Sequence, residues 1–226
     1  MTPTEGGSGS RMVEVEVTER YLIPEPPQIQ LPAEDGEPLE SPWHRAQINL
    51  LIESVQQHWE DRTDFFAGGN MFLYYSARQA RQRDYKGPDF FVVKPTDGQR
   101  LRKAWIVWEE DGQYPNLIVE LLSPTTADAY LGPKKDLYER RFKTPEYFCY
   151  DPDADRLQGW RLGATGYAAI APDPQGRLWS DELKLLVGTW VGTYQKIPAT
   201  WVRFFDPSGA MVPTAAERLA LLEDQA

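Results

Sequence analysis

Residues 115–124 read PNLIVELLSP, and this stretch decides the fold. An apolar run of about six residues between prolines is typical of a strand that is buried on both faces of a sheet. Glu120 interrupts the run, although a carboxylate is costly to bury unless a cation or hydrogen bonds compensate it. The stretch therefore predicts a central strand over Leu117–Leu122 whose single acid needs a partner.

Two further stretches supply groups that would compensate this acid. Residues 88–93 read PDFFVV and place Asp89 at the entry to a second apolar strand. Residues 132–138 read GPKKDLY and place Lys134 and Lys135 at the start of a helix. Two carboxylates suit a divalent ion such as Mg²⁺, which prefers oxygen ligands and commonly takes one or two carboxylates from the protein. Such an ion would lower the pKa of an attacking water, and a neighbouring lysine would orient that water or offset charge.

The remaining pattern predicts an α/β (α+β) fold. Ser41 is a good N-cap and Pro42 suits the first helical position, so a helix is expected from here to about residue 60. Short apolar runs between turn residues predict further strands at Met71–Tyr75, Phe90–Val93, Ala104–Trp108, Glu146–Tyr150, Arg156–Leu162, Tyr167–Ile170, Leu183–Trp190 and Trp201–Phe205. Later helices are expected at Leu131–Phe142 and Pro213–Leu222. This order predicts a mixed central sheet flanked by helices, with additional β-hairpins.

Length and composition indicate a single folded domain. The chain has 226 residues, of which 41% are hydrophobic, so a packed core is expected and wholesale disorder is excluded. We expect a flexible or extended arm over residues 1–33, a domain over residues 34–210, and a short C-terminal helix or tail over residues 211–226. The sequence begins without the apolar region of a secretory signal, and no apolar run reaches the length of a membrane span. We therefore predict a cytoplasmic location and no membrane partner.

Charge and cysteine content exclude several kinds of site. The net charge of −10 counts against a simple basic nucleic-acid binder. Basic residues nevertheless outnumber acids over residues 78–103 and over residues 134–143. The single cysteine, Cys149, excludes an internal disulfide and a zinc site built from several cysteines. Cys149 lies in the apolar string EYFCY and is interpreted as a core residue.

The longer strings around these groups resemble a known family. PDFFVV, NLIVELLSPTT and LGPKKDLYERRFKTPEYFCYDPDAD are similar to the restriction endonuclease family called Uma-type, within the PD-(D/E)xK nuclease superfamily. The likeness covers about residues 34–222. It implies a restriction-endonuclease-like fold, with a metal site at one edge of the central sheet. Asp89 and Glu120 would be the metal ligands, assisted by the backbone carbonyl of Leu121, with Mg²⁺ as the ion and Mn²⁺ as its substitute.

The lysine departs from the superfamily pattern. A lysine usually stands two positions after the glutamate, where this chain has Leu122. The family resemblance implies that the following helix supplies it, and Lys134 matches the pattern better than Lys135. Many relatives also carry an aspartate directly before the Leu-Gly pair, but this position is Tyr130 here, with Asp128 two residues earlier. No role is therefore assigned to that acid.

Each candidate also has a purely structural interpretation. Asp89 could cap a turn before its strand. Glu120 could pair with an arginine such as Arg78 or Arg81, and the lysine pair could form a solvated helix face. His44, on the first helix, is interpreted as a surface or capping residue in preference to a member of the site.

The sequence leads to one main hypothesis and one alternative. The main hypothesis is a Mg²⁺-dependent endonuclease that hydrolyses DNA phosphodiesters with metal-activated water, and the two basic clusters would line the approach of the DNA. Cleavage of both strands of a duplex usually calls for two active sites, so a homodimer is expected. The alternative is a catalytically degenerate nuclease-fold protein that acts as a binding or assembly module. RNA or branched DNA as substrate would use the same chemistry, and the sequence does not separate these cases.

Overall fold

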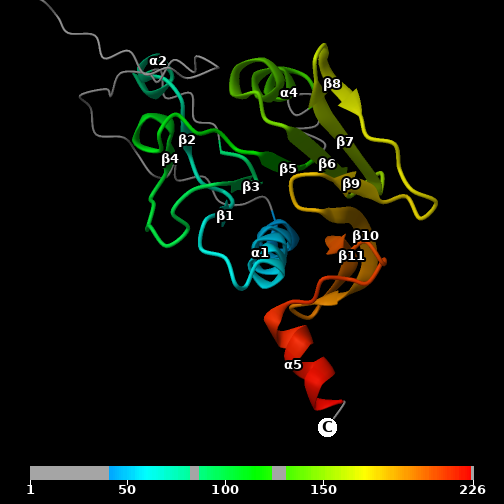
Figure 1. Ribbon diagram of the computed structural model, residues 1–226. Helices are drawn as coiled ribbons and strands as arrows, with labels where there is room; N and C mark the ends of the chain where they lie inside the picture. Colours follow the sequence, from blue (N-terminus) through cyan, green and yellow to red (C-terminus); the bar gives the residue numbers. More distant parts are fainter. Residues whose placement is uncertain (1–40, 82–86, 124–130, 225–226) are drawn as a thin grey trace, which may run out of the picture.

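The apolar stretch that dominates the sequence forms β5 (Leu117–Leu121), near the middle of a six-stranded sheet. Figure 1 shows the computed structural model, which describes residues 41–81, 87–123 and 131–224. Within the sheet, β5 pairs antiparallel with β3 (Phe90–Val93) and parallel with β6 (Glu146–Asp151). The expected mixed sheet is thereby confirmed.

The other strands extend this sheet or form two smaller ones. The large sheet has the order β1-β3-β5-β6-β7-β8, where the outer strands are β1 (Phe66–Gly68), β7 (Arg156–Gly163) and β8 (Gly166–Ala169). An antiparallel three-stranded sheet contains β9 (Leu178–Ser180), β10 (Leu185–Tyr194) and β11 (Ile197–Phe205). The short strands β2 (Leu73–Tyr74) and β4 (Trp105–Ile106) pair in parallel.

The described helices are α1 (Pro42–His58), α2 (Ala77–Arg81), the 3₁₀ turn η1 (Val107–Glu109), α4 (Pro133–Asp136) with its continuation η2 (Leu137–Phe142), and α5 (Ala215–Glu223). Of these, α1 packs on one face of the large sheet and η2 on the other. In Figure 1, α1 lies on the side of the sheet where β10 and β11 are found, whereas α4 and α5 lie far apart at opposite ends of the view. No described helix combines the length and apolar character that a membrane crossing requires.

Side chains of the central strands alternate between two cores, because successive residues of a strand point to opposite faces. Leu117, Val119 and Leu121 of β5 pack into the core that contains α1 and the three-stranded sheet. Ile118 packs into the other core, which contains η2. Glu120 shares the face of Ile118, so its carboxylate is directed toward the helix that follows β5.

The local sequence explains where α1 begins. The Ser41 side chain accepts a hydrogen bond from the backbone amide of His44, and Pro42 occupies the first turn, as expected. Further along the helix, the buried Gln47 side chain both donates to the carbonyl and accepts from the amide of Val202 in β11, at 3.0 and 2.7 Å. A side-chain amide thus joins α1 to the three-stranded sheet.

Several elements differ from the expectations. The strand expected over Ala104–Trp108 ends after two residues and turns into η1. β1, α2 and β9 were not expected, because each is too short to show a periodic pattern. β10 and β11 form a longer hairpin than expected; its turn, Gln195-Lys196, has both residues in the left-handed region without the glycine or asparagine that usually marks such a turn. The arm expected over residues 1–33 lies outside the described residues.

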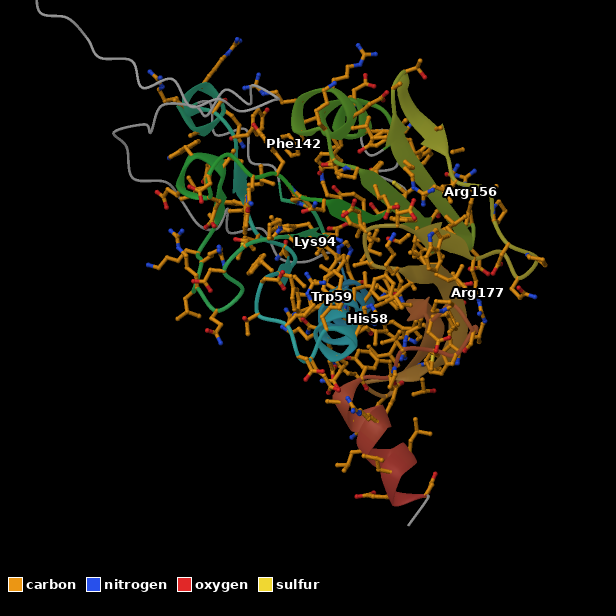
Figure 2. The ribbon with its side chains drawn as sticks, in the orientation of Figure 1. His58, Trp59, Lys94, Phe142, Arg156 and Arg177 are labelled. Carbon is orange, nitrogen blue, oxygen red and sulfur yellow. The ribbon has the colours of Figure 1, made fainter. Side chains whose placement is uncertain are left out.

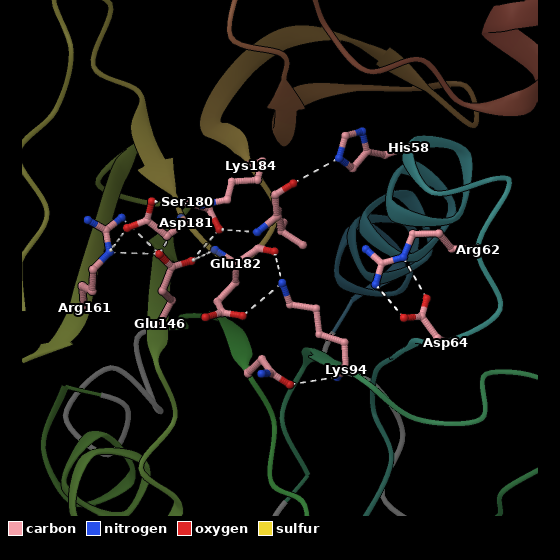
Figure 3. Close-up of polar contacts among 12 residues, drawn as sticks. His58, Arg62, Asp64, Lys94, Glu146, Arg161, Ser180, Asp181, Glu182 and Lys184 are labelled. Carbon is pink, nitrogen blue, oxygen red and sulfur yellow. Dashed lines mark hydrogen bonds and ion pairs between the residues drawn. The ribbon is translucent and has the colours of Figure 1, made fainter.

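Glu146, at the start of β6, connects the two larger sheets (Figure 3). Its carboxylate is 1% exposed and accepts hydrogen bonds from the Ser180 hydroxyl, the Arg161 side chain and the backbone amides of Asp181 and Glu182. The charge and the oxygen lone pairs are therefore satisfied within the protein, as a buried carboxylate requires.

We predict that Glu146→Ala lowers the free energy of unfolding by about 3 kcal/mol, because it removes the buried carboxylate that accepts from the Ser180 hydroxyl and from two backbone amides. Urea denaturation measures this loss. Glu109→Ala is the matched control, because this side chain is half exposed and its Arg100 partner lies 3.7 Å away. Equal unfolding midpoints for the two variants would contradict the prediction.

Candidate active site

The register of β3 against β5 brings Asp89 and Glu120 together. Phe90 pairs with Val119, so the residues next to this pair, Asp89 and Glu120, lie side by side. The Asp89 amide donates to Glu120 Oε2 at 3.2 Å, and the Leu121 amide donates to Asp89 Oδ2 at 2.7 Å. The two carboxylates expected as metal ligands therefore share one buried position at the end of the strands.

Glu120 is fully buried and is held by two donors on one oxygen. Lys134 Nζ lies 3.1 Å and the Tyr138 hydroxyl 2.6 Å from its Oε1. Burial raises the pKa of Glu120 to about 7; Lys134 acts in the lowering direction, the Asp89 carboxylate raises it further, and Tyr138 lowers it. Two carboxylates in one buried site favour a bound cation, because a cation removes their mutual repulsion.

The helix after β5 determines which lysine reaches the site. α4 begins with Pro133 in its first turn and continues into the wider π-helical turns of η2. Lys134 and Tyr138 are four residues apart and therefore lie on one face, toward Glu120. Lys135 points elsewhere, and its Nζ lies 4.5 Å from the centre of the Trp160 ring. The geometry thus brings Lys134 and not Lys135 to the carboxylates.

The alternative partners for Glu120 do not make this contact. Within the described residues, the cation beside Glu120 is Lys134, whereas Arg81 donates to the carbonyl of Ala77 in its own helix α2. Tyr138 is a member of the site that the sequence reasoning missed. It is marked only by its spacing of four residues from Lys134 on an expected helix.

His44 corrects a sequence-based interpretation. It was expected to be a surface or capping residue, but it is 7% exposed and its Nε2 lies 3.0 Å from Asp89 Oδ1. The first turn of α1 brings His44 to Asp89 in the folded chain. The sequence does not reveal this contact, because His44 and Asp89 are 45 positions apart. Its neighbour Trp43 packs edge-on against the His44 ring at 6.5 Å.

The donor set fits a hard divalent ion. Asp89 and Glu120 provide carboxylate oxygens, the ligand type that Mg²⁺ prefers, and Mg²⁺ commonly keeps several waters as its remaining ligands. Across residues 41–81, 87–123 and 131–224, no group of three or more His, Cys, Asp or Glu side chains is arranged to enclose a metal ion. Asp89 and Glu120 would hold such an ion through their carboxylate oxygens.

Two residues of the basic cluster at residues 78–103, Arg102 and Lys94, are paired with acids inside the protein. The Arg102 side chain is 2% exposed, binds both oxygens of Glu110 at 2.7 and 2.9 Å, and lies over the Trp105 ring. Lys94 pairs with Glu182 at 3.2 Å. These cations stabilise loops, so they do not form the free positive surface that the sequence suggested. Arg83 and Lys86 lie outside the described residues.

Comparisons with known proteins identify the family of the chain. Among curated proteins, none matches the sequence. A solved structure from Anabaena variabilis, described as a putative nuclease belonging to DUF820, is similar with 13% identity and a TM-score of 0.46, over 65% of this chain and 76% of that one. The model of the Uma2 family, described as "Putative restriction endonuclease", matches residues 16–194, a range that contains the two carboxylates and Lys134. With a match over most of its length, this chain belongs to the Uma2 family, and it has an α+β fold with a mixed central sheet.

Proposed function

We propose that the chain is a Mg²⁺-dependent endonuclease that hydrolyses DNA phosphodiester bonds. The observation that carries the proposal is the convergence of Asp89, Glu120 and Lys134 at one end of β3 and β5, in a chain whose family is described as restriction endonucleases. The proposed substrate is duplex DNA, and the proposed assembly is a homodimer, since cutting both strands calls for two sites.

Asp89 and Glu120 would hold the ion, with the backbone carbonyl of Leu121 as a further ligand. When bound, the ion would lower the pKa of the attacking water and stabilise charge on the phosphate. The Tyr138 hydroxyl and Lys134 both hold Glu120 Oε1, which fixes the orientation of this carboxylate. The Lys134 side chain is 18% exposed, whereas Glu120 is fully buried, and the ammonium lies 3.1 Å from the Glu120 carboxylate. There it would orient the water and offset negative charge in the transition state.

We predict that wild-type protein nicks supercoiled plasmid DNA with Mg²⁺ or Mn²⁺, and that a chelator abolishes the activity. Asp89→Ala and Glu120→Ala should each lower the rate by about 1,000-fold or more, because loss of the ion removes several kcal/mol of transition-state stabilisation. Agarose gel electrophoresis over a time course measures the rate. Glu109→Ala, at a half-exposed position, is the matched control and should cleave normally. Full activity in Glu120→Ala would disprove the proposal.

A second prediction separates the two lysines. Lys134→Met should lower the cleavage rate by about 100-fold or more, since a positioned acid–base group contributes at least this factor. Lys135→Met removes an identical charge from the next residue, where the ammonium lies over Trp160, and should leave the rate within a few fold of wild type. The reverse result would assign the role to Lys135.

The degenerate-site alternative has its own test. Titration calorimetry with Mn²⁺ should detect binding to wild-type protein and its loss in Asp89→Ala. If wild type binds Mn²⁺ but cuts neither duplex nor single-stranded DNA, the ion site is present and the DNA endonuclease proposal fails. If wild type binds no Mn²⁺, the binding-module alternative is favoured.

A further inference from the structure

His44 contacts one carboxylate oxygen of Asp89, and a backbone amide of the sheet contacts the other. Asp89 Oδ2 accepts from the Leu121 amide at 2.7 Å, and Asp89 Oδ1 lies 3.0 Å from His44 Nε2. His44 and Asp89 are each 7% exposed, so solvent contributes little to either contact. A carboxylate that is held on both oxygens cannot rotate, and its remaining lone pairs keep a defined direction.

The first two turns of α1 are anchored around His44. The His44 amide is capped by Ser41, and the Trp43 indole donates to the Thr200 carbonyl at 3.3 Å. One turn later, Gln47 makes its pair of hydrogen bonds to Val202. The imidazole is therefore presented to Asp89 from a helix that is attached on both sides of His44 to β11. This strand begins at residue 197, beyond the range that the family model matches.

The other histidine of the chain provides a comparison. His58, labelled in Figure 2, is the last residue of α1. Its Nε2 contacts the carbonyl of Leu183 at 3.0 Å (Figure 3). It lies at the opposite end of the helix from His44, and its hydrogen bond goes to a backbone carbonyl and not to Asp89 or Glu120. Both histidines thus use Nε2 in a hydrogen bond to oxygen, but only His44 contacts a proposed metal ligand.

We propose that His44 is a positioning residue for Asp89: its Nε2–H orients the carboxylate so that the free lone pairs face the shared site with Glu120. This inference rests on the proposed metal site and adds a residue to it. Groups that donate to a metal-binding carboxylate keep the ligand in place, and their removal typically lowers metal affinity or activity by 10–100-fold. An imidazole is a poor ligand for Mg²⁺, so a role in orienting Asp89 suits His44 better than direct coordination.

Three substitutions at His44 test the inference by Mn²⁺ titration calorimetry. His44→Leu removes the donor and should weaken Mn²⁺ binding by about 10-fold or more. His44→Gln carries an amide nitrogen at nearly the distance of Nε2 from the backbone, and should restore most of the affinity. His44→Asn carries the same amide one carbon closer to the backbone and should not restore it. His58→Leu, at the other end of the helix, should bind Mn²⁺ as wild type does.

Thermal melting followed by circular dichroism shows whether each variant is folded, and plasmid cleavage is measured in parallel. If His44→Leu binds Mn²⁺ with wild-type affinity, or if His44→Asn restores binding as well as His44→Gln, the inference is overturned. A wild-type chain that binds no Mn²⁺ overturns it as well. If the affinity series behaves as expected but neither the wild type nor any variant cleaves DNA, the positioning role stands and the proposed endonuclease activity fails.

Discussion

Glu120 lies in the central strand of the large sheet with none of its surface exposed. The surrounding elements supply the groups that compensate its buried carboxylate. A buried carboxylate without compensation would cost several kcal/mol. The chain compensates it from three directions: the Asp89 amide at the start of β3, Lys134 in α4 and Tyr138 in η2. The helix that crosses from β5 to β6 therefore has two tasks, since it connects parallel strands and carries the cation of the site.

A second buried carboxylate, on the neighbouring strand β6, is compensated by hydrogen-bond donors within the protein. Glu146 accepts hydrogen bonds from a guanidinium, a hydroxyl and two backbone amides, and its role is to join two sheets. Glu120 instead lies beside another carboxylate, and burial holds its pKa well above the usual range. A buried carboxylate that is fully hydrogen-bonded, such as Glu146, stabilises a fold. A carboxylate with a perturbed pKa beside a second acid, such as Glu120, is characteristic of functional sites.

Most of the central elements could be predicted because their signals are local. The apolar runs at Phe90–Val93 and Leu117–Leu121 and the Ser41-Pro42 helix start depend only on residues close together in the chain. His44 could not be assigned to the site because its contact with Asp89 depends on how α1 packs against the sheet. Arg102 was misjudged for a related reason: a charge count does not reveal that the guanidinium is already bound to Glu110.

Lys134 lies on a helix and not on the strand of Glu120, which affects how related sites can be recognised in sequences and how their spacing can change. When a lysine follows the glutamate on the same strand, the alternation of side chains keeps the two residues two positions apart. Here the ammonium approaches from a helix that packs on the face of the sheet, so the number of residues between Glu120 and Lys134 is not set by strand geometry. Insertions or deletions between them are compatible with the same contact. Relatives of this chain will therefore be overlooked by searches for a short string with fixed spacing, and will be found by searches for three side chains in space.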